Sequence, residues 1–270
     1  MAGPGFAFAL TFESKVFTFG FIDPAEQVGA APRFSVTVKT VEGNVEAALE
    51  AAVTSRRRDF ALAKVIDHPA KLSASKAVEF ETVAKSYDAV TLERFAAVEG
   101  KLLVARCERE RAEFEAFRQR CVAILDAIEL TKTAPQGPAV SGPGFFVTMP
   151  PSLLVGQVYA FKETNDDMED FIEVRLNMGQ WPGDLAGLAV LEVQPAYVTT
   201  KSRMSRRSTN GLPSVYFDNS TGGAPMIRQL QRRTVASGRG YVVSCETDVG
   251  SFAKNRSTCL KVLDSIRVGP

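Results

Sequence analysis

At 270 residues, with 45% hydrophobic and 23% charged residues, the chain has the composition of a folded globular protein with room for two ordinary domains. Its formal net charge is +1, whereas proteins that bind nucleic acid or anionic membrane surfaces usually carry a strong basic excess, so neither is an expected partner. No apolar run approaches the roughly 20 residues that a membrane helix needs. Because the first residues lack the pattern of a signal or transit peptide, we expect a cytoplasmic protein.

The chain contains an internal duplication. Leu92–Leu130 and Leu230–Val268 align without a gap at an offset of 138 residues, and twelve of the 39 pairs are identical. Average composition would give about two or three identities. The identical pairs include all four cysteines, Cys107 with Cys245 and Cys121 with Cys259. We therefore expect two copies of one module.

In the first copy, hydrophobic periodicity predicts two strands, a helix, a meander of strands and a closing helix. The expected strands are Val16–Ile22, Arg33–Thr40, Lys76–Thr82, Thr91–Val98 and Lys101–Glu108, and the expected helices are Val45–Phe60 and Arg111–Ile128. Asn44 can cap the first helix, and Glu99-Gly100 can form a tight turn between the last two strands. Apolar residues recur at steps of three and four in the closing helix, which is typical of a helix that covers a sheet.

The second copy repeats this plan after a segment rich in Pro, Gly and small residues, Thr131–Gly144, which we predict to be a linker. The expected elements are a short helix near Asp184–Val193, the strands Pro213–Asn219, Leu230–Ala236 and Arg239–Glu246, and a last helix over Gly250–Ile266. A turn at Ser237-Gly238 joins the final two strands. The predicted modules are residues 1–130 and 145–270.

These elements predict an α+β fold made of two tandem α/β/α sandwich modules, each a mainly antiparallel sheet with its C-terminal helix packed across it. We expect Phe114, Phe252 and the four cysteines in the cores. Free thiols are the first expectation, because small buried thiols suit both a strand and a helix position. One disulfide per repeat is the alternative.

The Gly-centred hairpin and the helix that follows it, ending in Ile124–Ile128 (ILDAI) or Val262–Ile266 (VLDSI), resemble the PsbP-like superfamily. That group includes the extrinsic P protein of the oxygen-evolving complex, the Ran-binding factor Mog-one and the DcrB-type lipoproteins. The Ala-rich composition is similar to that of algal flagellar-associated proteins of the axonemal central apparatus.

The resemblance implies a non-enzymatic structural or adaptor protein that docks onto a larger assembly. A ciliary axoneme component is the most concrete form of this hypothesis, with a coiled-coil scaffold or other axonemal proteins as partners. One alternative is a small-GTPase regulator of the Mog-one kind. Another is a small-ligand or lipid carrier that uses a pocket between sheet and helix.

Motifs for enzyme chemistry are missing from the sequence, which has no G-x-S-x-G, H-E-x-x-H or phosphate-binding loop. The lone histidine, His68, lies in a turn-like Asp-His-Pro sequence and cannot build a multi-histidine metal site. We therefore expect no enzyme activity, no metal site and no cofactor.

One basic cluster is a candidate protein-binding site. Lys201, Arg203, Arg206 and Arg207 fall in what should be an exposed loop, and the next residues, Ser208 and Thr209, are candidates for phosphorylation by a basophilic kinase. An acidic partner could bind this loop, although a merely solvated charged loop is the simpler interpretation. Trp181, the only tryptophan, would be a partner-binding anchor if exposed, but we favour its burial.

Overall fold

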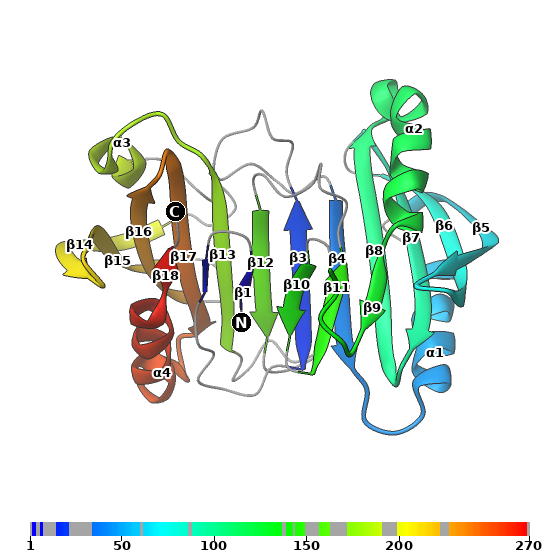
Figure 1. The fold of residues 1–270 in the computed structure, drawn as a ribbon, viewed down its shortest axis with the longest axis horizontal. Helices are drawn as coiled ribbons and strands as arrows, with labels where there is room; N and C mark the ends of the chain where they lie inside the picture. The colour runs from blue at the N-terminus through cyan, green and yellow to red at the C-terminus, as the bar shows by residue number, and fades with distance from the viewer. Residues whose placement is uncertain are drawn as a thin grey trace. The chain divides into compact units, whose positions relative to one another are not determined.

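The computed structural model describes residues 2–3, 6–7, 15–21, 34–59, 62–85, 88–136, 139–142, 144–148, 157–162, 172–190, 199–221 and 227–268. The chain divides into two compact units. Unit 1 comprises Met1–Pro32 and Leu153–Pro270, and unit 2 comprises Arg33–Ser152. Strands dominate both units and their pairing within each unit is antiparallel, so the predicted α+β class is confirmed (Figure 1).

Unit 2 is built on a sheet in the order β4-β8-β7-β6-β5. Its strands are β4 (Phe34–Thr40), β5 (Leu62–Leu72), β6 (Ser75–Ala84), β7 (Ala89–Val98) and β8 (Lys101–Glu110), and its helices are α1 (Val45–Arg57) and α2 (Arg111–Asp126). The Asn44 side chain accepts hydrogen bonds from the backbone N–H groups of Glu46 and Ala47, as predicted for a helix cap. Three short strands, β9 (Glu129–Thr131), β10 (Ala139–Gly142) and β11 (Phe145–Thr148), form a separate small sheet.

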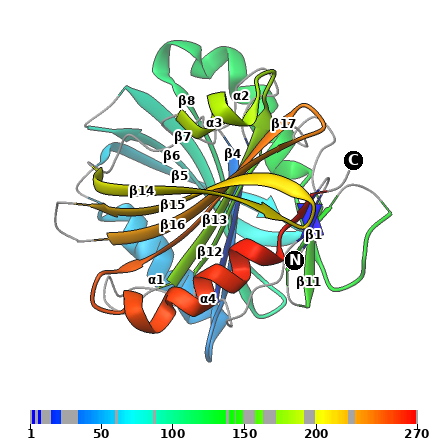
Figure 2. The same cartoon turned by 90° about the vertical axis from the view of Figure 1, so that its left-hand side faces the viewer.

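Unit 1 repeats the same plan with one change. Its sheet runs β14-β15-β16-β17-β13-β12-β3 (Figure 2). The strands are β3 (Val16–Phe21), β12 (Gln157–Lys162), β13 (Ile172–Gln180), β14 (Thr199–Thr209), β15 (Leu212–Thr221), β16 (Ile227–Ala236) and β17 (Arg239–Asp248), with helices α3 (Leu185–Val190) and α4 (Phe252–Ser265). The small sheet of this unit pairs β1 (Ala2–Gly3), β2 (Phe6–Ala7) and β18 (Arg267–Val268).

The start of the chain therefore belongs with the second repeat, which corrects the predicted module boundaries. Strand β3 pairs antiparallel with β12, and β2 pairs with β18 at the other end of the sequence. The predicted linker is also different: Thr131 ends β9, and β10 lies inside the segment that was expected to be unstructured. Small residues made this segment look like a loop, but β10 gains order by pairing with β11.

The two helices of unit 1 lie on opposite faces of its sheet. Side chains alternate along β17, so Val242, which packs with Leu188 of α3, and Cys245, which is bonded to Cys259 of α4, point to different sides. The end of the short helix α3 is completed by a side chain. The buried Arg233 guanidinium donates hydrogen bonds to the backbone carbonyls of Leu188 and Ala189, which belong to the last turn of α3.

The cysteines form two disulfides, so the expectation of free thiols is wrong. Cys107 of β8 is bonded to Cys121 of α2, and Cys245 of β17 to Cys259 of α4, with Cα–Cα separations of 5.9 and 5.4 Å. Those separations lie within the range that a disulfide spans. All four side chains are buried, as predicted for core positions.

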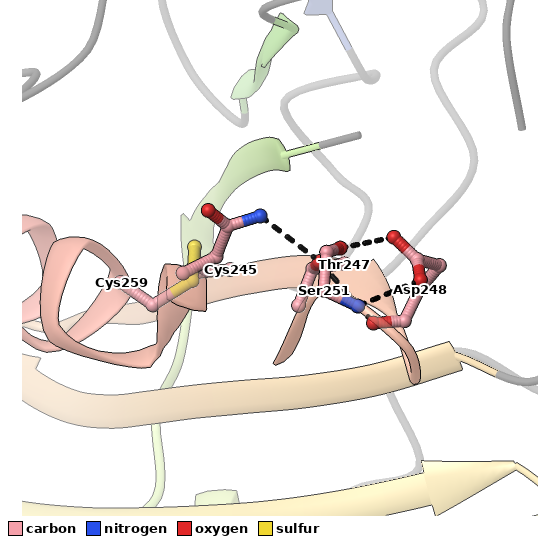
Figure 3. Close-up of a disulfide and its surroundings, with 6 residues drawn as sticks. Cys245, Thr247, Asp248, Ser251 and Cys259 are labelled. Carbon is pink, nitrogen blue, oxygen red and sulfur yellow. Dashed lines mark hydrogen bonds between the residues drawn. A yellow bond between two sulfur atoms is a disulfide. The ribbon is translucent and has the colours of Figure 1, made fainter. Parts of the chain in front are cut away.

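A hydrogen-bond network closes the start of α4 next to its disulfide (Figure 3). Asp248 accepts a hydrogen bond from the Ser251 backbone N–H at 2.9 Å and a second from the Ser251 hydroxyl. The hydroxyls of Thr247 and Ser251 lie 2.8 Å apart, and the Asn255 amide donates to Thr247. The end of β17 and the first turn of α4 are thus held together by polar contacts, and the helix then continues to the disulfide at Cys259.

The helix-to-strand disulfide should contribute measurable stability. We expect the double variant Cys245→Ala/Cys259→Ala to lose about 2–4 kcal/mol of unfolding free energy, because the unfolded chain gains the freedom of an open loop. Urea denaturation followed by circular dichroism measures this loss. A thiol reductant should lower the stability of the wild type by more than that of the double variant, which has already lost one of the two disulfides. A wild type whose stability does not respond to reductant would contradict the prediction.

Glu246 is a buried carboxyl group on the α3 face of unit 1. It is 1% exposed, and the Gln229 amide donates to one of its carboxyl oxygens at 2.7 Å. Burial raises the pKa of Glu246, and the favourable charge of Arg175 and the Gln229 hydrogen bond only partly offset it. The unfolded chain therefore loses this proton first. Stability falls as the pH rises from the ordinary pKa of the group to its raised value in the folded protein.

We predict that Glu246→Gln stabilises the protein at neutral pH. The amide keeps a carbonyl oxygen for Gln229 and removes the cost of ionising or protonating a buried group. The gain should shrink as the pH falls and vanish below about 4.5, the ordinary pKa, where the carboxyl group is neutral in both states. Thermal unfolding midpoints of variant and wild type across this pH range measure the difference, and a gain that does not change with pH would contradict the argument.

Candidate functional site: a basic groove in the second repeat

The predicted basic loop is a strand. Thr199–Thr209 forms β14, which pairs along its length with β15, and residues 203–208 are exposed. A strand at the edge of a sheet can have both faces in solvent, so it needs none of the apolar alternation by which strands are predicted. Arg203, Arg206, Arg207 and Ser208 are accessible as expected, whereas the side chains of Lys201 and Thr209 lie outside the described residues.

The arginines of β14 point to both faces of the sheet. In the β14–β15 register, Arg203 lies opposite Asp218 and Ser205 opposite Tyr216. Tyr216 faces α4, because its hydroxyl donates a 2.6 Å hydrogen bond to Asp264 at the end of that helix. Arg203 and Arg207 therefore share the α4 face, and Arg206 points to the α3 face.

Strand β14 and helix α4 enclose a groove of about 200 Å³, which we call the basic groove. Its charged and polar lining residues are Arg203, Ser205, Arg207, Tyr216, Asp218 and Arg256, and its apolar ones include Met204, Leu230 and Leu260. The Arg207 guanidinium lies over the Tyr216 ring, 5.1 Å from its centre. Three guanidinium groups from two separate elements thus line one cavity with an aromatic and aliphatic floor.

The groove has a positive charge that nothing in its described lining neutralises. Asp218 is the single carboxylate among those residues, and Arg228 from β16 already donates to it at 2.5 Å. The Arg228 guanidinium also stacks on Phe252, 4.3 Å from the ring centre, at the start of α4. Phe252 is half-buried beneath this contact, whereas its counterpart Phe114 is 1% exposed in the core.

A buried arginine fixes the floor of the groove. Arg232 is 1% exposed; its Nε donates to the Ser214 hydroxyl at 3.1 Å and another guanidinium nitrogen donates to the Leu263 carbonyl at 2.9 Å. Burial lowers the pKa of Arg232. Together with the bond between Tyr216 and Asp264, these contacts join β15 and β16 to the last turn of α4.

The equivalent groove of the first repeat is charge-balanced, which makes it an internal reference. The positions of Arg203 and Arg207 hold Ile66 and Ala70 there, at an offset of 137 residues. Arg118, the counterpart of Arg256, donates to Glu81 at 2.8 Å and to Glu115 at 2.7 Å. These hydrogen bonds, with Glu115 contributing most, raise the pKa of the Arg118 guanidinium. The duplicated module therefore has one charge-balanced groove and one basic groove.

A second groove of about 400 Å³ lies on the α3 side of β14. It is lined by Leu185 and Ala186 of α3, by Arg206 and Ser208 of β14, and by β15 residues that include Pro213 and Val215. Ser208, the accessible phosphorylation candidate, therefore lies on the opposite face from the basic groove.

Two other residues singled out from the sequence lie away from the basic groove. Trp181 is half-buried against Leu188 and Val242, and its indole N–H donates to the Asp184 carbonyl at 2.9 Å. It therefore packs α3 onto the sheet. His68 was expected in a turn and instead lies exposed on strand β5.

Arg256 and Tyr216 were missed as site residues. Arg256 is identical to Arg118 in the alignment, which indicated a structural role, and only the neighbours of each arginine differ. Tyr216 belongs to a predicted strand without any charge, and its place beside Arg207 depends on strand pairing. A comparison of charge between matched positions of the two repeats would have found both.

The two equivalent arginines should respond oppositely to removal. We predict that Arg118→Ala costs about 0.5–1 kcal/mol, because Glu81 and Glu115 lose their partner near the surface. Arg256→Ala should be neutral or slightly stabilising, since it relieves repulsion with Arg203 and Arg207. Urea denaturation at low and high salt measures both, and the Arg118→Ala loss should shrink with salt. Equal losses for the two variants would contradict the charge difference between the grooves.

No helix of the described residues is long and apolar enough to cross a membrane, and these residues hold no group of three or more His, Cys, Asp or Glu side chains placed to bind a metal ion. No family model and no curated protein matches the sequence. Among solved structures, the chain is similar to the immunity protein TplEi of the T6SS from Pseudomonas aeruginosa in its apo form, with 8% identity and a TM-score of 0.43 over 97% of each chain. It is also similar to a chain of the Tle4-Tli4 complex, with 9% identity and a TM-score of 0.44 over 99% of each chain. A third similar structure is TplEi complexed with "L" peptide, at 11% identity and a TM-score of 0.40 over 99% of each chain. At these TM-scores the similarities assign no function to this chain.

Proposed function

We propose that this protein is a non-enzymatic binding module that holds an acidic segment of a protein partner in the basic groove. The observation that carries the proposal is the convergence of Arg203, Arg207 and Arg256 on one cavity, in the repeat that lacks the carboxylates of its twin. Guanidinium groups bind carboxylates with paired, charge-assisted hydrogen bonds, so an acidic side chain is the natural ligand.

The surroundings of the arginines favour a protein over a nucleic acid. Leu230, Leu260 and the Tyr216 ring lie beside the charges, and mixtures of Arg, aromatic and aliphatic side chains are typical of the centre of protein interfaces. Nucleic acid binding depends on many phosphate contacts and hence on a broad basic surface. The chain as a whole carries a formal charge of only +1.

The two disulfides bear on where such binding would take place. Disulfides persist in secreted, periplasmic and other oxidising environments and are rare in the cytosol. We therefore place the protein in an oxidising compartment, in contrast to the cytoplasmic address expected from the sequence. The axonemal, small-GTPase and carrier hypotheses stay predictions from the family resemblance.

A charge-reversal experiment tests the proposal. The probe is a fluorescein-labelled peptide of alternating Glu and Val, titrated with the full chain at low salt and followed by fluorescence anisotropy. We expect Arg203→Glu/Arg207→Glu/Arg256→Glu to weaken binding at least about tenfold, or about 1.4 kcal/mol. Binding by the wild type should also fall with added salt.

The matched control is Arg58→Glu/Lys71→Glu/Arg120→Glu, which reverses three exposed cations of unit 2 and changes the net charge by the same amount. It should bind the peptide within about twofold of the wild type. If both triple variants lose binding equally, the effect belongs to overall charge and the groove has no special part in it. If neither does, the proposed function is wrong.

A further inference from the structure

We propose that the acidic segment binds as an added β-strand on the open edge of β14, so that main-chain hydrogen bonds join the two chains. This inference rests on the proposed function and specifies the conformation of the partner. β14 ends the strand order of its sheet, and in the part of the chain that the structure describes no strand pairs with its outer side. Its pairing with β15 is regular from Lys201 to Thr209, which leaves a straight row of outward backbone groups.

The first repeat identifies which backbone groups point outward. Strand β5 is the counterpart of β14, and its register with β6 is the same: Pro69 lies opposite Val78, as Arg206 lies opposite Val215. Proline has no N–H, so within a strand it takes a position whose amide would point away from the neighbouring strand. The N–H of Arg206 therefore points outward, away from β15. By alternation, so do the backbone groups of Met204 and Ser208.

The same comparison explains why only one of the two edges can accept a strand. Pro69 interrupts the outer row of donors on β5, which blocks continuous pairing there. The sequence of β14, TTKSRMSRRST, contains no proline. Its outer side therefore offers an unbroken alternation of donors and acceptors.

Charge excludes a second copy of this edge as the occupant. Arg203, Arg206 and Arg207 are all exposed and would face the same three cations across a self-paired edge, and like charges opposite one another destabilise a strand pair. An acidic strand has the opposite preference. The exposed cations thus deter self-association and select for acidic partners in one arrangement.

The two faces of β14 predict the pattern of the added strand. Side chains on its α4 face would lie beside Arg203 and Arg207, which favours Asp or Glu. Side chains on the other face would lie beside Met204, which is 58% exposed and has room for an apolar neighbour. The partner we infer is an extended segment with alternating acidic and apolar residues.

The test compares Arg206→Pro with Arg206→Ala in the full chain. Both remove the same charge, but only proline removes the outward N–H, and Pro69 shows that this register accepts a proline without losing the ladder. With the Glu/Val peptide, Arg206→Pro should bind about three- to tenfold more weakly than Arg206→Ala, as expected for one lost hydrogen bond and a blocked neighbour. Equal affinities of the two variants would overturn strand addition.

A second measurement keeps the test decisive if Arg206→Pro does not fold. The wild-type chain is titrated with a Glu/Val peptide that carries N-methyl groups on alternate residues, which keeps its charge and removes half of its donors. Strand addition predicts about tenfold weaker binding for at least one of the two methylation registers. If both methylated peptides bind like the parent while the triple groove variant still fails, the partner is not an added strand and the proposed function stands. If the parent peptide also binds the groove variant, the proposed function itself fails.

Discussion

Each repeat buries an arginine guanidinium beneath the end of its C-terminal helix, and the rest of the module is arranged around it. Arg94 donates to Asp126 at 2.5 Å and to Glu79 at 2.6 Å, and Arg232 at the equivalent position donates to the Leu263 carbonyl and to Ser214. A cation can be buried only when its donors find acceptors, so the sheet and the last helical turn must keep their relative positions. The disulfide fixes another part of the same helix. Because α4 is held at two points, Arg256 on its surface keeps a fixed distance from β14.

The difference between the repeats is concentrated around this shared frame. Where the first repeat has Glu79, the second has Tyr216, so the buried Arg232 loses a carboxylate partner and the groove gains an aromatic floor. Ile66 and Ala70 correspond to Arg203 and Arg207. Exchanges at these few surface and rim positions turn a charge-balanced surface into a basic one, and the buried apolar residues of the module retain their pattern.

Local patterns predicted the hairpins and helices well because those elements depend on neighbours in the sequence. Glu99-Gly100 and Ser237-Gly238 adopt positive φ angles in tight turns, and the capped helix begins at Val45 as expected. Pairing over long distances left no such trace. The partner of β3 is more than a hundred residues away, and nothing in the sequence of Val16–Phe21 distinguishes it from a strand of the first module. The spacing of the cysteines suited both free thiols and disulfides, and only the facing of strand and helix decides between them.

The basic groove shows the same division. Its arginines on β14 were identified as a cluster, but their separation onto two faces depends on the strand that the cluster forms. Arg256 joins them only through the packing of α4. Charge patterns in one dimension could therefore predict an interaction surface and could not predict its shape.

Unit 1 is assembled from both ends of the chain, and this has a consequence for synthesis on the ribosome. Arg33–Ser152 is continuous and has all its strands once that stretch has emerged. The first 32 residues leave the ribosome earlier, yet β3 has to wait for β12 and β2 has to wait for β18, the last strand made. The chain therefore folds from its middle outward, and its first residues are secured only when translation is complete.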